Sequence, residues 1–213
     1  MQKLTLTGHC VTAPVPRNRI YCPVLDGLTP RQADLSFVMP RMDHNRALRE
    51  TANQGDWASI LASDPFGSTS AFFARLKELG YKGVANWPSS ILLEGILKET
   101  MATIPATPEF EYDVLASAQS AGLDAMAFFL SLQQARAAMK AGLKRLVLHP
   151  GLLVSEGGIA PDMVLGSLQR LINALKSEAS TVEVLVYTSA WHEKSLPLST
   201  LTADGVIWFG GAP

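Results

Sequence analysis

The sequence predicts an α/β protein, a compact (β/α)8 TIM barrel with an irregular first βα unit. Short apolar runs alternate with amphipathic helical stretches, and eight such runs can be counted. No low-complexity linker divides the 213 residues, so we expect a single domain over residues 1–213. An open doubly wound sheet is the alternative, but no glycine-rich phosphate-binding turn follows any of the runs.

The elements are justified in chain order by their apolar periodicity. The predicted strands span 4–7, 20–25, 57–62, 82–86, 124–130, 145–149, 182–187 and 206–209. Apolar residues at helical spacing predict helices over 43–53, 69–79, 91–101, 108–121, 133–141 and 161–177. Gly80 is placed to end one of these helices, and Pro161 to begin another. Only the short loop 13–19 joins the first two strands, which leaves no room for a helix there.

The composition excludes several classes of protein. With 47% hydrophobic and 17% charged residues, the chain can bury a core. A net charge of -1 and the lack of a recognised motif argue against a nucleic-acid partner. No run of 18 apolar residues is present, so we expect no membrane span and no membrane partner. Cys10 and Cys22 lack metal-ligand spacing, which indicates reduced thiols and a cytoplasmic location.

Polar residues that follow the strands are the candidates for chemistry, because active sites of this fold lie at the carboxyl ends of the strands. His149 ends its strand and is the candidate for acid/base work, with a hydrogen-bonded structural histidine as the alternative. Asp64 could orient water or cap the next helix. Glu94 could do the same or simply complement a helix dipole at the surface. These three residues form the predicted catalytic set.

A second set of residues is predicted to bind the substrate. Amide and hydroxyl groups after the fourth strand could orient a carboxylate, and glycine amides could hold a phosphate or carboxylate. A turn is the alternative for Asn86, and a flexible loop is the alternative for Gly157 and Gly158. The set comprises Asn86, Ser89, Gly157, Gly158, Gly210 and Gly211.

Metal and nucleophilic chemistry have little support in the sequence. There is no HxH, HExxH or paired cysteine motif, so no protein metal site is predicted, although an optional Mg²⁺ at Asp64 or Glu94 stays open. Ser89, His149 and Asp64 could be assembled into a triad on paper, but no nucleophile elbow is present.

Several short motifs occur in an order that resembles the phosphoenolpyruvate hydrolase-like TIM-barrel family. In chain order they are FVMPRMDHN (37–45), SDPF (63–66), GVANWP (83–88), LLEG (92–95), FEYDV (110–114), HPGLL with GGIA (149–160) and WFGGA (208–212). The family's glycine-rich turn after the first strand and its NSGR-like segment after the second have no counterpart here.

The resemblance implies a barrel that binds a small oxyacid or phosphorylated acid at the mouth formed by the carboxyl ends of its strands. It places the side chains of Asp64, Asn86, Glu94 and His149 at this mouth, with the glycines as backbone contacts. The implied activity is a hydrolase or lyase reaction on such an acid. A related barrel forms part of a plant antiviral resistance protein, so the alternative is a non-catalytic regulatory or ligand-binding barrel that works through protein–protein interaction.

A homo-oligomer is also expected. Residues 1–50 hold seven Lys/Arg and four Asp/Glu, a net charge of +3. The missing first helix would leave apolar barrel surface near this segment, and a second subunit could cover it.

Overall fold

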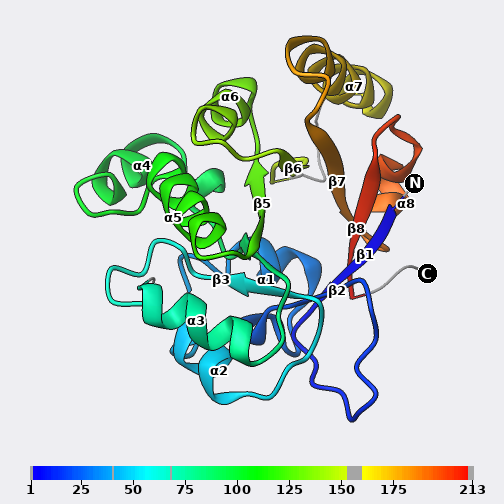
Figure 1. The fold of residues 1–213 in the computed structure, drawn as a ribbon. Helices are drawn as coiled ribbons and strands as arrows, with labels where there is room; N and C mark the ends of the chain where they lie inside the picture. The colour runs from blue at the N-terminus through cyan, green and yellow to red at the C-terminus, as the bar shows by residue number, and fades with distance from the viewer. Residues whose placement is uncertain (1, 40, 68, 153–159, 211–213) are drawn as a thin grey trace.

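The computed structural model describes residues 2–39, 41–67, 69–152 and 160–210, and in it eight parallel strands close into a barrel in sequence order. Helices surround most of this barrel (Figure 1). The strands are β1 (Gln2–Thr7), β2 (Arg19–Tyr21), β3 (Trp57–Ile60), β4 (Gly83–Asn86), β5 (Asp124–Phe129), β6 (Arg145–Leu148), β7 (Glu183–Ser189) and β8 (Gly205–Phe209). The predicted (β/α)8 TIM barrel is therefore confirmed.

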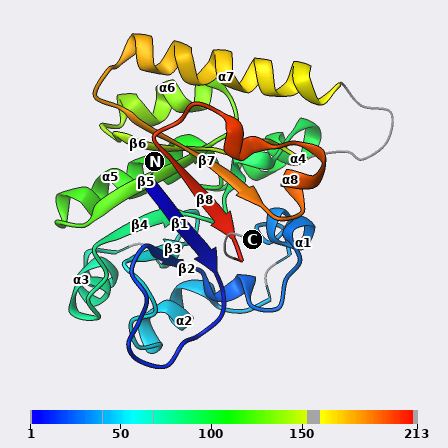
Figure 2. The ribbon, with the colours of Figure 1, turned by 90° about the vertical axis from the view of Figure 1, so that its right-hand side faces the viewer.

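The first and last strands close the barrel. β1 and β8 pair in parallel from Gln2↔Gly205 to Leu6↔Phe209. Figure 2 shows these two strands side by side, with no helix in front of them. Their arrowheads point to the end of the barrel where α1, α4 and α8 lie, which is the mouth.

The helices begin at the signals that the sequence carries. Thr69, Thr107 and Ser131 each precede a helix and accept a hydrogen bond from the backbone N–H three residues on. Gly80 adopts a φ of 92° just beyond α3, as predicted for a helix-ending glycine. The helices are α1 (Pro30–Asp34), α2 (His44–Glu50), α3 (Ser70–Glu78), α4 (Gly95–Met101), α5 (Pro108–Ser120), α6 (Leu132–Lys140), α7 (Pro161–Glu178) and α8 (His192–Ser195), with 3-10 turns η1 (Pro23–Leu25), η2 (Ser90–Leu92) and η3 (Leu198–Thr200).

Three predicted elements differ from the structure. The second strand ends at Tyr21, because Pro23 has no N–H for a ladder and begins η1 instead. The helix predicted over 91–101 is divided into η2 and α4, with extended backbone at Glu94 between them. Helix α1 was not predicted, although Thr29 and Gln32 form a capping box that marks its start.

The core has two layers on either side of the strands. Alternate residues of each strand point into the barrel, and they include Leu4, Leu6, Trp87, Phe128 and Tyr187. The other residues pack outward against the helices in a larger cluster. Whether a strand residue faces the barrel interior or the helices therefore depends on its odd or even position along the strand.

The first unit differs in surface character from what the sequence suggested. The connection from β1 to β2 contains no helix, as predicted. The outward side chains of β1 are those of Lys3, which is exposed, and Thr5, which is half-buried. The apolar surface expected there is therefore wrong, since polar side chains occupy this part of the barrel wall. Among the described residues, no helix combines the length and apolar character needed to cross a bilayer.

Candidate functional site

A stack of aromatic rings fills the barrel interior below the mouth. Trp87 follows β4, His149 follows β6 and Tyr187 lies on β7, and all three side chains are buried. The His149 ring stacks on Trp87 with centroids 5.1 Å apart and on Tyr187 with centroids 4.7 Å apart. Phe128 lies against Trp87, with centroids 4.9 Å apart. Aromatic side chains thus form the floor of the mouth.

Both ring nitrogens of His149 have a partner. The backbone N–H of Gly151 donates to Nδ1 at 3.1 Å, and Nε2 lies 3.3 Å from Oδ1 of Asp34. Because Nδ1 acts as an acceptor, the ring proton is on Nε2, and this N–H donates a hydrogen bond to the Asp34 carboxylate. His149 has an exposed fraction of 0%, and Asp34 is also buried. The sequence had placed His149 here but had not singled out Asp34, which ends α1.

Asp34 is the charged centre of this part of the barrel. Besides its bond to His149, its charge acts on both Tyr187 and His192. Burial, followed by the charges of Asp34 and Cys22, raises the pKa of Tyr187 well above its ordinary value. Burial lowers the pKa of His192 to about 4, so this histidine is neutral at neutral pH.

His192 is held by the residue that ends β7. Its backbone N–H donates to Oγ of Ser189 at 3.1 Å, and the same Oγ lies 3.0 Å from its Nδ1. The serine oxygen accepts the first bond, so its own hydrogen is available for Nδ1. Nε2 of His192 then carries the ring proton and is a donor.

Three buried donor groups around this stack have no hydrogen-bond partner within the described ranges. They are the Trp87 Nε1–H, the Tyr187 hydroxyl and the His192 Nε2–H. The Tyr187 and His192 rings lie edge to face, with centroids 5.8 Å apart. A buried polar group without a partner costs about 1–3 kcal/mol, and native proteins contain few of them. All three belong to side chains that contact one another, so they are free to donate to one acceptor group. We call Trp87, His149, Tyr187, His192 and Asp34 the mouth cluster.

The side chains of Asn86 and Ser89 belong to a different network, outside the barrel wall. Because Trp87 points inward, its neighbour Asn86 points outward to α5. There Glu111 accepts from Nδ2 of Asn86 at 2.8 Å, from Oγ of Ser89 at 2.5 Å and from the N–H of Ser90 at 2.8 Å. Oδ1 of Asn86 accepts from the N–H of Phe128 at 2.7 Å. These bonds join β4, β5 and α5, and they engage both polar ends of the Asn86 amide.

Glu111 carries this network in a fully buried position. Burial raises the pKa of its carboxyl group, and the hydrogen bonds from Ser89, Ser90 and Asn86 act in the opposite direction. The sequence included Glu111 in a family-like motif but gave it no role. A buried acid on the inner side of a helix, 25 positions from Asn86, is a tertiary contact that no local pattern reveals.

Asp64 organises the loop after β3. Its carboxylate accepts from the N–H of Phe66 at 2.9 Å and from Nδ2 of Asn45 at 3.1 Å. Asn45 in turn bonds both backbone groups of Leu61. Asp64 is thus tied to α2 and to its own turn, and no hydrogen bond joins it to His149.

Of the remaining predicted residues, the structure describes Glu94 and Gly210. The exposed side chain of Glu94 precedes α4 and makes no capping bond. Gly210 follows β8 with a φ of 76°, and its N–H donates to the carbonyl of Leu6 at 2.9 Å. Gly157, Gly158 and Gly211 lie outside the described residues. Of the nine predicted residues, the structure places His149 in the mouth cluster, and their individual roles stay predictions.

The donor set gives little support to a metal ion. Within the described ranges, no three His, Cys, Asp or Glu side chains come together as metal ligands. Asp64 and Glu94, the residues considered for an optional Mg²⁺, do not belong to any such group. We therefore derive no chemical step from a metal.

The closed barrel of eight parallel strands makes this chain a TIM-barrel protein. Enzymes of this fold have their active sites at the carboxyl ends of the strands, which is where the mouth cluster lies. The model of the family described as "Phosphoenolpyruvate hydrolase-like" matches residues 36–189. The chain therefore belongs to the phosphoenolpyruvate hydrolase-like family.

Two curated relatives come from Solanum lycopersicum. They are the ToMV resistance protein Tm-1(GCR237) and the ToMV susceptible protein tm-1(GCR26), each 26% identical over 132 residues. The match covers 58% of this chain and 18% of each relative, so the chain spans about a fifth of their length. Among solved structures, a flavocytochrome b2 variant is similar with a TM-score of 0.52 and 13% identity, over 97% of this chain and 56% of that one. This likeness shows the fold alone.

Proposed function

We propose that this chain binds a small carboxylic or phosphorylated acid at the mouth of the barrel. The observation that carries the proposal is a set of three buried donors that have no partner in the part of the chain that the structure describes, Trp87 Nε1, Tyr187 Oη and His192 Nε2. A carboxylate or phosphate offers several acceptor oxygens, which is what such donors lack. The family to which the chain belongs is named for an acid of this class.

The proton balance of the mouth cluster is compatible with such a ligand. Asp34 already supplies one negative charge, so an anion beside it requires a compensating proton. Both ring nitrogens of His149 are engaged, since Nδ1 accepts from the N–H of Gly151 and Nε2 faces Asp34, so the ligand brings that proton by binding as a partly protonated acid. In this proposal His149 positions Asp34, and His192 donates a hydrogen bond to the ligand.

A ligand needs a path to the buried cluster. Asp34 ends α1, a five-residue helix, and its carboxylate contacts His149. Because His149, Tyr187 and His192 are all buried, a ligand reaches them when α1 moves aside. The hydrolase or lyase reaction on the bound acid is part of the same proposal.

A thermal-shift series tests binding. Phosphoenolpyruvate, pyruvate and inorganic phosphate are added with and without Mg²⁺ to the wild type, Tyr187→Phe and Tyr112→Phe. A ligand at 100 times its Kd stabilises a protein by about 2.7 kcal/mol. We expect a shift for the wild type and for Tyr112→Phe, whose altered hydroxyl bonds the Phe128 carbonyl elsewhere in the core, and a lost shift for Tyr187→Phe.

Turnover is measured separately as release of phosphate or pyruvate from phosphoenolpyruvate. Binding that shifts the midpoint but leaves the acid intact would favour the alternative function, a non-catalytic ligand-binding barrel. That alternative has its own support, because exposed apolar side chains surround the mouth, as a protein-binding surface requires. If no acid shifts the wild type, or if Tyr187→Phe responds as the wild type does, the proposed site is wrong.

A further inference from the structure

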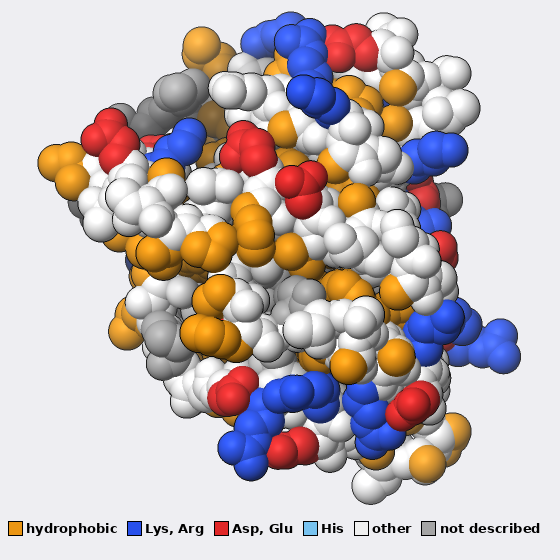
Figure 3. Space-filling model, turned by 60° about the vertical axis from the view of Figure 1, so that its left-hand side comes forward, with side chains coloured by type: hydrophobic (Ala, Val, Ile, Leu, Met, Phe, Trp, Pro, Cys, Tyr) orange, Lys and Arg blue, Asp and Glu red, His pale blue; other side chains and the backbone are white. Residues whose placement is uncertain are grey.

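The exposed large hydrophobic side chains gather on one end of the barrel. Within the described residues, each of them lies between the end of a strand and the first turn of the next long helix, on the side of the mouth. They are Leu35, Val38, Met39, Met42, Phe66, Ile96, Leu97, Ile104, Leu152 and Met163. Figure 3 shows hydrophobic side chains gathered at the left and centre of one face, with most Lys and Arg at its margins. Such a distribution indicates a binding surface rather than scattered exposure.

Helix α4 is the clearest case of an uncovered element. None of its residues is buried, and the side chains of Ile96 and Leu97 are 82% and 48% exposed. A helix of seven residues is marginal by itself in water and takes its stability from packing of an apolar face. We call Ile96, Leu97 and Ile104 the α4 ridge. This ridge lacks the packing that normally accompanies such a sequence.

A cavity of complementary character lies beside α1. Its volume is about 410 Å³, within the range of pockets that receive small molecules. Leu28, Leu35 and Met39 provide its apolar lining, and Gln32 and Arg41 add polar groups. We call it the α1 cavity. Its lining matches aliphatic side chains with an acidic group nearby.

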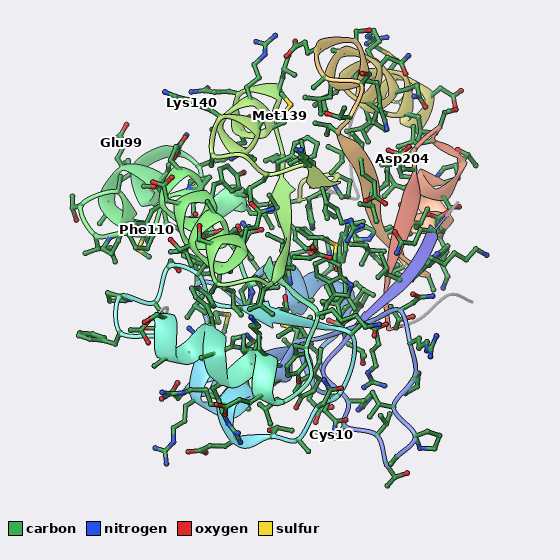
Figure 4. The ribbon with its side chains drawn as sticks, in the orientation of Figure 1. Cys10, Glu99, Phe110, Met139, Lys140 and Asp204 are labelled. Carbon is green, nitrogen blue, oxygen red and sulfur yellow. The ribbon has the colours of Figure 1, made fainter. Side chains whose placement is uncertain are left out.

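The charged groups at the two features differ in sign. Arg41 is the charged residue among the described lining of the α1 cavity, and the exposed side chains of Arg31, Asp26 and Asp43 lie near it in the chain. On α4, Glu94 and Glu99 are exposed, and Lys98 is the cation of this helix. Figure 4 shows Glu99 pointing away from the barrel. Pairing the α4 ridge with the α1 cavity therefore brings acidic side chains toward Arg41.

We propose that two copies of this chain form a symmetric dimer in which the α4 ridge of each copy enters the α1 cavity of the other. In a two-fold dimer the same contact occurs twice: the α4 ridge of the first copy meets the α1 cavity of the second, and the ridge of the second meets the cavity of the first. Both features lie at the same end of the barrel, since α1 and α4 are both on the right of Figure 2, toward which β1 and β8 point. A symmetric dimer requires the α4 ridge and the α1 cavity to lie on the same side of the molecule in this way. The dimer places the two mouths toward one another.

Sedimentation velocity on the full chain tests the proposal with a matched pair of variants. The side chains of Met39 and Met163 are 63% and 65% exposed, but only Met39 lines the α1 cavity. We expect a dimer for the wild type and for Met163→Glu. Met39→Glu and Ile96→Glu should be monomers, with circular dichroism spectra like that of the wild type, because neither position is buried.

Charge reversal tests the pairing itself. Glu99→Arg should weaken dimerisation at low salt by at least about tenfold in Kd, which corresponds to about 1.4 kcal/mol. Adding Arg41→Glu to that variant should restore much of the affinity. A monomeric wild type, an open series of larger assemblies, or equal loss of dimer in Met163→Glu and Met39→Glu would overturn the proposal. Failure of the double variant to recover would overturn the ridge-to-cavity pairing.

Discussion

Two buried tyrosines with opposite hydrogen-bonding states allow a direct test of the mouth cluster. Tyr187 and Tyr112 are both fully buried. The Tyr112 hydroxyl donates to the carbonyl of Phe128 at 3.0 Å, whereas the Tyr187 hydroxyl has no partner within the described ranges. Replacing each with phenylalanine removes the same atom from two different environments.

The expected effects on stability have opposite signs. In Tyr112→Phe, a satisfied hydrogen bond is lost, which costs about 0.5–1.5 kcal/mol. In Tyr187→Phe, an unsatisfied buried hydroxyl disappears, and this should stabilise the free protein by up to about 1–3 kcal/mol. For a chain of this size, 1 kcal/mol shifts the Tm by about 2–4 °C. The free Tyr187→Phe variant should therefore melt at least about 2 °C above the wild type, and Tyr112→Phe at least about 1 °C below it.

Differential scanning calorimetry without added ligand measures both midpoints, and urea unfolding at 25 °C checks the free energies. A gain in stability together with the loss of acid binding would show that the Tyr187 hydroxyl is kept for a ligand at the expense of the fold. If Tyr187→Phe is destabilised as much as Tyr112→Phe, the hydroxyl has a partner in the native protein, and the reasoning behind the site fails.

Three further predictions concern stability. Burial lowers the pKa of both His44 and His192 from 6.5 to about 4, so between these pH values the unfolded chain binds protons that the folded protein does not. The stability that each neutral histidine contributes is complete above pH 6.5 and falls by about 2 kcal/mol between pH 6.5 and 5. In urea unfolding, the free energy of His44→Gln and His192→Gln should depend less on pH than that of the wild type, and an unchanged slope would contradict this. Burial raises the pKa of Glu111, so its contribution is complete below about pH 4.5 and declines as the pH rises through the folded pKa. The stability of the wild type relative to Glu111→Gln should decrease over that range, and an increase would refute this sign. Gly83→Ala should cost about 1–3 kcal/mol in urea unfolding, because the new Cβ would lie 2.4 Å from the Trp57 ring and 2.8 Å from the backbone oxygen of Asp124. A neutral result would mean that both the ring and the neighbouring strand can move.

The barrel could be predicted because its signals are local. Apolar runs, capping residues such as Thr107 and Ser131, and helix-ending glycines such as Gly80 each act within a few positions. The boundaries of the second strand and of the helix after Trp87 could not be placed as well, because a proline and an extended linker decide them. The capping box at Thr29 was a readable signal that marked α1.

The site was less predictable because it depends on direction and on distant contacts. The strands are buried on both faces, so their runs of apolar residues do not show which side chains point inward. Applying the two-residue period from Trp87 would have placed Asn86 on the outer face. Asp34 could not be found this way, because it contacts His149 from 115 positions away through a helix of five residues.

The pairing of β1 with β8 has a consequence for synthesis of the chain. All neighbouring strands but this pair are consecutive in sequence, so β1 waits unpaired on one side until residues 205–209 have been made. Until then a nascent barrel carries two open edges, one on β1 and one on β7, and such edges invite pairing with other chains. The five residues of β8 close both edges at once, because they pair with β7 on one side and with β1 on the other.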